Sequence, residues 1–236
     1  MALAARSSSF LQFTLVRRVS SARTAAKSRA VTRAMGAAIP EGDHFTIPDQ
    51  PARFAKGKAE NNTRMLTTEF FDGGFLKGQR VLVTGGNRGV GLALVKELVA
   101  CGAMVVVTCR RSNDELGALQ NVEVIEKCDV QDLASVEKMV HAVGDPLDIV
   151  INNAGYFYEP EETVTSMNFE EQLKMIDICA VGPLRVSSAL WRGGKIKKNG
   201  GKIAMITSQG GSVAWRVVQN PEGKDYGHHM SKSAAN

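Results

Sequence analysis

The segment from Val81 to Gly91 contains the residues whose spacing most clearly predicts chemistry. A short apolar strand is followed by Gly85-Gly86-Asn87-Arg88-Gly89-Val90-Gly91 and then by a helical pattern. Glycines let the backbone approach a phosphate closely, and a helix N-terminus offers free N–H groups and partial positive charge. A tight turn alone could explain such glycines, but the strand–turn–helix context favours a dinucleotide site. We therefore predict that the pyrophosphate of a nicotinamide dinucleotide binds at Gly85, Asn87, Arg88, Gly89, Val90 and Gly91.

The end of the next apolar run bears on the choice of dinucleotide. An acid at this position would bind the ribose 2′-hydroxyl and repel a 2′-phosphate, but the run ends in Thr108-Cys109-Arg110-Arg111. The guanidinium groups of Arg110 and Arg88 suit the bidentate geometry of a phosphate. We predict NADP(H) rather than NAD(H), with solvated surface charge as the alternative reading of these arginines.

Short apolar runs alternate with helix-period segments from Gln79 onward. Strands are predicted at 80–84, 103–108, 122–125, 147–151 and 202–206, and helices at 90–100, 115–119, 133–143 and 169–190. Strands that alternate with helices form right-handed crossovers and a parallel sheet covered on both faces. The sequence thus predicts an α/β, doubly wound Rossmann fold with strand order 3-2-1-4-5.

The T-G-x-x-x-G-x-G spacing of the glycine turn resembles that of the short-chain dehydrogenase/reductase family. Three further motifs agree in type and order: Asp129 after the third strand, Asn152-Asn153-Ala154-Gly155 after the fourth, and Thr207-Ser208 at the end of the fifth. N-R-G-V-G-L and G-P-L-R resemble the carbonyl-reductase and C-factor-like branch. The resemblance covers residues 79–236. It implies that Asp129 contacts the adenine amino group, and it adds the cofactor contacts Val130, Asn153, Ala154, Gly155 and Lys232.

The resemblance also implies a catalytic set of Asn, Ser, Tyr and Lys, which this chain keeps only in part. Ser208 would orient a carbonyl oxygen, and Lys232 would hold the nicotinamide ribose. His228 stands where the family has its acid tyrosine, four residues before the lysine, and Cys179 stands where it has asparagine. Tyr226 comes two residues too early, about 200° away on a helix, so it could serve only if the chain is irregular there.

An imidazole at position 228 is a reasonable proton donor, because it titrates near neutrality. Lys232 beside it would disfavour the cationic form and leave N–H donation from the neutral ring. We therefore take Ser208, His228, Lys232 and Tyr226 as candidate catalytic residues. The alternative is that His228 and His229 are polar surface residues of a site that has lost its catalytic activity. No metal site is predicted, since the pair of histidines has no third ligand.

Residues 1–40 differ from the rest of the chain. They hold seven basic residues and no acid, and they are rich in Ser and Ala. This composition predicts an organelle transit peptide, chloroplast rather than mitochondrion, with a disordered basic tail as the alternative. Residues 41–78 are read as a linker or N-terminal arm, and 79–236 as the Rossmann domain. Without the seven cations the net charge falls from +5 to −2, so no nucleic-acid partner is predicted.

Further expectations concern partners and extent. No run reaches the roughly 18 apolar residues of a membrane span, and four cysteines without C-x-x-C spacing indicate a reduced compartment. Helix 169–190 is either a homodimer face or a core helix. The chain stops four residues after Lys232, whereas the family continues with a sixth strand and a substrate loop. We therefore expect a fragment lacking these parts, with an unpaired edge on the fifth strand.

Three functions follow from these residues. The first is an organellar NADPH-dependent reductase acting on a small carbonyl or alcohol substrate by hydride transfer. The second is a catalytically degenerate NADP(H)-binding module for regulation or assembly, motivated by His228 and Cys179. The third, an RNA-associated scaffold, rests only on the pI near 9.1 and loses its motive when the leader's cations are removed.

Overall fold

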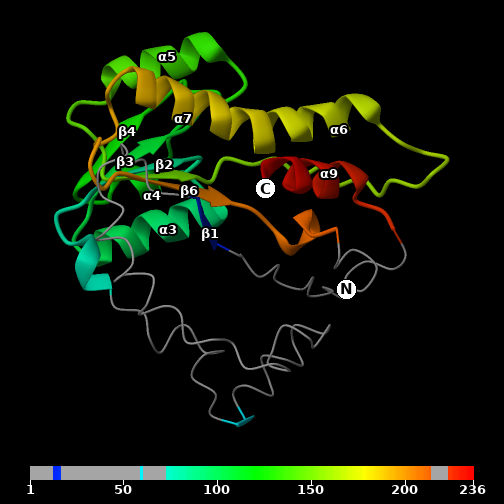
Figure 1. The fold of residues 1–236 in the computed structure, drawn as a ribbon, viewed down its shortest axis with the longest axis horizontal. Helices are drawn as coiled ribbons and strands as arrows, with labels where there is room; N and C mark the ends of the chain where they lie inside the picture. Colours follow the sequence, from blue (N-terminus) through cyan, green and yellow to red (C-terminus); the bar gives the residue numbers. More distant parts are fainter. Residues whose placement is uncertain (1–12, 17–58, 61–72, 214–222) are drawn as a thin grey trace, which may run out of the picture.

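The computed structural model describes residues 13–16, 59–60, 73–213 and 223–236 of the 236-residue chain. Their strands form one sheet in the order β1-β6-β5-β2-β3-β4 (Figure 1). In chain order the strands are β1 (Phe13–Val16), β2 (Arg80–Thr84), β3 (Met104–Thr108), β4 (Val122–Ile125), β5 (Ile149–Asn152) and β6 (Lys202–Ile206). Strands β2 to β6 pair in parallel, in the predicted order 3-2-1-4-5, which confirms the Rossmann-like α/β fold.

Helices connect the strands of the sheet. They are α3 (Gly89–Ala100), α4 (Asp114–Gly117), α5 (Leu133–Ala142), α6 (Phe169–Ile176), the π-helix η5 (Asp177–Val181), α7 (Gly182–Arg192) and α9 (Tyr226–Ala235), with 3-10 turns η4 (Gly73–Leu76) and η6 (Gln209–Gly211). Asn113, Asp132 and Asn168 accept hydrogen bonds from backbone N–H groups in the first turns of α4, α5 and α6. No helix in the described part of the chain is long and apolar enough to cross a membrane.

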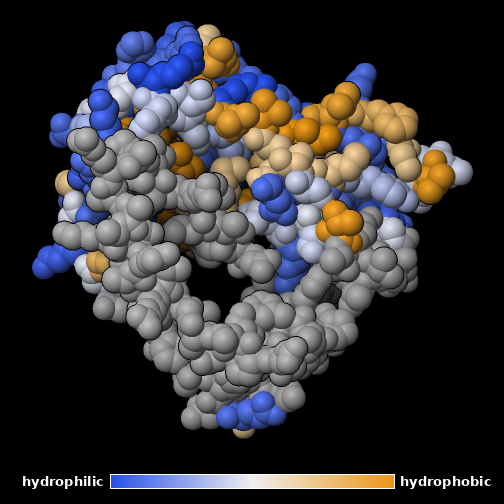
Figure 2. All heavy atoms as spheres, in the orientation of Figure 1, coloured by the Kyte–Doolittle hydropathy of each residue, from blue (hydrophilic) through white to orange (hydrophobic). Residues whose placement is uncertain are grey.

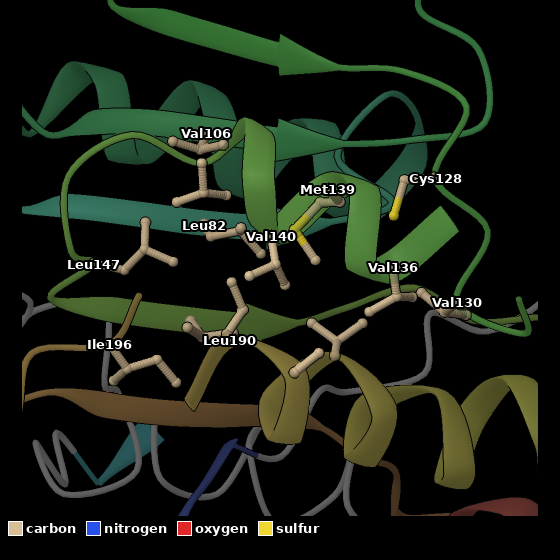
Figure 3. Close-up of a cluster of buried hydrophobic side chains, with 14 residues drawn as sticks. Leu82, Val106, Cys128, Val130, Val136, Met139, Val140, Leu147, Leu190 and Ile196 are labelled. Carbon is tan, nitrogen blue, oxygen red and sulfur yellow. The ribbon is translucent and has the colours of Figure 1, made fainter. Parts of the chain in front are cut away.

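Two apolar clusters lie on opposite faces of the sheet. Strand residues alternate between them, so Leu82 and Val106 face α5 and α7, while Val81 and Val83 face α3. Figure 3 shows the first cluster, in which Met139 of α5 packs toward the strands. Because both faces are buried, these strands are continuous Val and Ile runs rather than alternating ones.

The predicted helix 169–190 is one long element with a π segment in its middle, α6–η5–α7. Phe169, Leu173 and Leu184 are 67%, 67% and 68% exposed, so a core position is wrong for these three residues. Gln172 and Met175 are the residues that α6 buries. Apolar side chains therefore gather on the outer surface of α6 and α7 (Figure 2).

One prediction about the sheet edge is wrong. Residues 13–16, within the segment set aside as a leader, pair antiparallel with β6 from Phe13↔Ile206 to Val16↔Ile203. The edge of β6 is therefore paired, because four residues distant in sequence supply the missing backbone partners. The rest of 1–40 and most of 41–78 lie outside the described residues, and the organelle address stays a prediction.

Candidate functional site

A cleft of about 600 Å³ lies at the carboxyl ends of the central strands, next to the β2–β5 switch point where the chain reverses direction across the sheet. It collects residues from every predicted dinucleotide motif. Among its lining residues are Gly85, Asn87, Arg88, Gly89, Val90, Gly91, Arg110, Asp129, Val130, Asn153, Ala154 and Gly155. The sequence motifs, scattered over 71 positions, thus meet at one place.

The glycine turn is closed to side chains at its tightest point. A Cβ on Gly91 would lie 2.2 Å from the Gly85 carbonyl oxygen and 2.5 Å from Asn153 Nδ2. Gly85 and Gly89 adopt φ of +65° and +53°, which favour glycine. Helix α3 has no side-chain cap and no acid in its first turn, so its N–H groups remain available to an anion. This cradle fits a pyrophosphate.

The segment after β5 braces that cradle. Asn153 Nδ2 donates to the carbonyl oxygens of Thr84 and Gly85 at 3.0 and 3.2 Å. The backbone N–H groups of Asn153 and Ala154 both donate to Thr84 Oγ1 at 3.0 Å. Asn153 and Thr84 therefore hold the turn in place through side-chain hydrogen bonds from the neighbouring strand.

Arg88 and Arg110 lie on the cleft wall and are exposed. Within the described residues, no ion pair involves either side chain. Arg111 does not line the cleft, and its carbonyl oxygen accepts a hydrogen bond from Asn87 Nδ2 at 2.9 Å. Two unpaired guanidinium groups are thus available to a phosphate from this wall.

The end of β6 carries Ser208 and approaches Lys232 of α9. Ser208 precedes η6, and its Oγ accepts a hydrogen bond from the Gly210 N–H at 3.1 Å. Lys232 Nζ donates to the Ile206 carbonyl oxygen at 3.1 Å, and Ile206 lines the cleft. The ammonium group therefore lies at the edge of the cleft, although Lys232 itself is not among its lining residues.

His228 packs into the same corner. Its ring meets Phe157 edge to face at 5.3 Å, and its Cδ2 lies 3.3 Å from where a Cβ on Gly210 would be. His228 and Ser208 therefore both contact Gly210. Burial, together with the charges of Lys232 and His229, lowers the pKa of His228 to about 4. The ring is neutral near pH 7, as predicted from Lys232, but burial is the larger cause.

Tyr226 has a different environment. It is the first residue of α9, and its hydroxyl lies 3.3 Å from where a Cβ on Gly223 would be. The chain is regular helix from this residue on, so the irregularity that would let Tyr226 replace His228 is not found. Next to it, Gly227 lets α9 approach α6, since a Cβ there would lie 2.2 Å from Met175 Cε.

Cys179 lies in the π segment and is buried. Its Sγ is 3.5 Å from the backbone nitrogen of Tyr156 and 3.6 Å from its carbonyl oxygen. The thiol thus contacts the backbone just after the Asn-Asn-Ala-Gly motif. Among the described residues, no cluster of His, Cys, Asp and Glu could hold a metal ion.

Seven residues that line the cleft were not predicted as site residues: Thr108, Cys109, Cys128, Tyr156, Lys174, Ile178 and Ile206. Lys174 Nζ lies 4.4 Å above the Tyr156 ring and 3.0 Å from Glu171 Oε1. A hydrogen bond to the Glu171 carboxylate raises the pKa of Tyr156. Tyr156 directly follows the Asn-Asn-Ala-Gly motif, which was an available signal, whereas nothing in the helical pattern distinguishes Lys174.

The chain is similar in sequence to known proteins. The sequence profile of the short chain dehydrogenase family matches residues 79–220. Human L-xylulose reductase is 33% identical over 149 residues, covering 62% of this chain and 58% of the relative. Galactitol 2-dehydrogenase of Agrobacterium fabrum is 31% identical over 143 residues, covering 58% of this chain and 55% of the relative. The chain thus spans little more than half the length of these two curated relatives.

A solved structure agrees in fold. The NADPH-bound carbonyl reductase from chicken fatty liver superposes with a TM-score of 0.56 at 25% identity, covering 67% of this chain and 70% of that one. The family profile matches well over half of the chain and includes the glycine turn, the Asn-Asn-Ala-Gly motif and Ser208. The chain belongs to the short chain dehydrogenase family.

Proposed function

We propose that the protein is an NADP(H)-dependent oxidoreductase that reduces a small carbonyl compound. The glycine cradle at Gly91, which a single Cβ would fill, is the observation that carries the proposal. NADP(H) is favoured over NAD(H) by Arg88 and Arg110 on the cleft wall, which form no ion pair with another described residue. The NADPH-bound carbonyl reductase that shares the fold, and the oxidoreductases similar in sequence, support the reaction class.

Different residues at the cleft would hold different parts of the dinucleotide. Gly85 to Gly91 would hold the pyrophosphate, Asp129 the adenine and Lys232 the nicotinamide ribose. When bound, the reduced dinucleotide supplies the hydride. The Ser208 hydroxyl would bind the carbonyl oxygen of the substrate.

His228 supplies the proton in this account. The ring N–H of the neutral imidazole would donate its proton to the carbonyl oxygen as that oxygen gains negative charge, and the resulting imidazolate would regain a proton from water. Because its pKa is about 4, the cationic ring is not populated near pH 7. Donation from the neutral form is weaker than from an imidazolium, so we expect slow turnover.

A non-catalytic NADP(H)-binding module is the second candidate. The lowered pKa of His228 and the engagement of Cys179 Sγ with the Tyr156 backbone favour it. The double change His228→Tyr with Cys179→Asn distinguishes the two candidates. Activity absent from the parent and present in the double variant supports the module, whereas high parental activity excludes it.

The test of the proposal is NADPH oxidation by the full chain with a panel of aldehydes and ketones. We expect turnover of at least one member, detected as loss of NADPH absorbance and recovery of the alcohol. Lys232→Ala should weaken it strongly. A protein that binds NADPH and turns over no member of the panel contradicts the reductase proposal.

We also propose a location in the cell and an oligomeric state. The leader composition favours delivery to the chloroplast, which a fusion of residues 1–40 to a fluorescent protein tests by microscopy. The exposed Leu173 and Leu184 on helix 169–190 favour a homodimer through this face. Light scattering should show a dimer that the double change Leu173→Glu with Leu184→Glu converts to a monomer.

A further inference from the structure

The first residue of the π segment joins two distant parts of the molecule. The Asp177 carboxylate accepts from Arg185 NH2 at 2.5 Å on one oxygen and from Gln131 Nε2 at 2.9 Å on the other. Gln131 belongs to the loop between β4 and α5. Asp177 thus ties this loop to the long helix through one oxygen and binds Arg185 of the same long helix through the other.

Arg185 of α7 reaches the same loop by a second route. Its NH1 donates to the Val130 carbonyl oxygen at 3.1 Å while its NH2 holds Asp177. Gly182 completes the docking, because a Cβ there would lie 2.9 Å from Val130 Cγ2. The loop from Asp129 to Gln131 is therefore held by a carboxylate, a guanidinium and a close backbone approach.

The length of the Arg185 side chain makes this arrangement feasible. Residues 177 and 185 are about 12 Å apart along a regular helix axis, and helical side chains lean toward the N-terminus, so only a long side chain at 185 reaches back to 177. Burial raises the pKa of Asp177, but its hydrogen bonds with Gln131 and Arg185 outweigh this and leave it lowered. The carboxylate is therefore charged near pH 7.

The loop that these residues hold lines the dinucleotide cleft. Asp129 and Val130 are cleft residues, whereas Asp177, Arg185 and Gln131 are not. We propose that Asp177 and Arg185 are positioning residues that fix the loop Asp129–Gln131 for the adenosine end of the dinucleotide. This inference rests on the proposed function, since it assigns the two residues to affinity for the same cofactor.

The expected effect follows from the conformations open to the loop. A loop in its binding conformation for only one tenth of the time weakens the apparent affinity about tenfold. Arg185→Met removes both guanidinium bonds while keeping an unbranched side chain. Arg185→Lys can restore one bond at a time, because an ammonium lacks the fork of a guanidinium. We expect Arg185→Met to weaken binding about tenfold and Arg185→Lys to weaken it less.

The experiment titrates the full chain with three probes, NADPH, 2′,5′-ADP and reduced nicotinamide mononucleotide. Asp177→Asn and Arg185→Met should weaken NADPH and 2′,5′-ADP alike and leave the mononucleotide unchanged. The matched control is Arg192→Met on the same helix, whose ion pair with Glu137 is exposed and 3.8 Å long. Loss of structure in general would weaken all three probes equally, and that result overturns the proposal.

A second readout needs no cofactor. Hydrogen exchange of the amides of residues 129–132 in the free protein should accelerate in Arg185→Met and not in Arg192→Met. Unchanged exchange, or 2′,5′-ADP affinity within twofold of the parent, overturns the positioning role even if NADPH still binds. A parent protein that binds neither NADPH nor 2′,5′-ADP overturns the proposed function first, and the positioning role with it.

Discussion

The turn after β2 and a second segment, made of the end of β6 and helix α9, both flank the cleft, but they keep the family pattern to very different degrees. In the turn, every glycine that the spacing requires is present, and Asn153 braces it from the next strand. In the second segment, Ser208 and Lys232 are in place while His228 stands at the tyrosine position. Binding a dinucleotide and using it are therefore separate properties here, with different residues and different tests.

The largest expected effect is a loss of NADPH affinity. Gly91→Ala places a Cβ against the Gly85 carbonyl oxygen, and such overpacking against backbone should destabilise the protein by about 3 kcal/mol. Movement of the turn to relieve this clash would misplace its N–H groups, and a loss of the same size in binding free energy corresponds to about 100-fold in NADPH affinity. Gly117→Ala in α4 is the control, since no atom lies within 4 Å of its Cβ position. Equal NADPH affinity in the two variants would contradict the cradle.

The next largest effect is a loss of kcat without a loss of NADPH affinity. Ser208→Ala removes the hydroxyl that would bind the carbonyl oxygen, and the loss of one such donor lowers kcat about 100-fold. The dissociation constant of NADPH should not change, because the proposal assigns Ser208 to the substrate carbonyl and not to the dinucleotide. Ser212→Ala, four residues further on, serves as control. A Ser208→Ala variant with full kcat would remove this residue from the mechanism.

A smaller effect tests the preference for NADPH over NADH. The double change Arg88→Ala with Arg110→Ala should weaken NADPH about 10- to 100-fold, the range for losing charged hydrogen bonds. NADH affinity should stay the same, since NADH lacks the 2′-phosphate. Arg111→Ala is the matched control outside the cleft. Parallel losses for NADPH and NADH would show that these arginines do not read the 2′-phosphate.

The smallest effect concerns the pH dependence of stability at His228. Its pKa is about 4 when folded, against 6.5 for an unperturbed ring, so the unfolded chain binds the extra proton between these values. Stability contributed by the neutral ring is present above pH 6.5 and is lost as the pH falls toward 4. With allowance for partial exposure, we expect about 2 kcal/mol.

Urea unfolding at pH 7 and pH 4.5 measures this loss. His228→Gln, which is neutral throughout, should be less sensitive to pH than the parent, whereas changing the exposed His141 to Gln should behave like the parent. Identical pH sensitivity of His228→Gln and the parent would place the His228 ring in water.

The parallel sheet could be predicted from the sequence because its signals are local. Runs such as Val105-Val106-Val107 must be buried on both faces, and glycines mark where strands and helices end. The residues that line the cleft were largely predictable for the same reason, since each predicted motif follows its own strand. All predicted cofactor residues except Lys232 line the cleft.

The features that escaped prediction depend on contacts between distant segments. No local pattern shows that residues 13–16 pair with β6, or that Lys174 lies over Tyr156. The π segment has no distinctive sequence, so the network of Asp177, Arg185 and Gln131 was not anticipated. These contacts are set by packing rather than by spacing along the chain.

We propose that the cleft binds NADP(H) whether or not the protein catalyses reduction. The most direct test of this proposal is a titration of the full chain with NADPH and NADH, followed by nicotinamide fluorescence or calorimetry. The account predicts one NADPH per chain with an affinity on the order of micromolar, and NADH at least about tenfold weaker. No binding of NADPH, or binding that Gly91→Ala leaves unchanged, would contradict it.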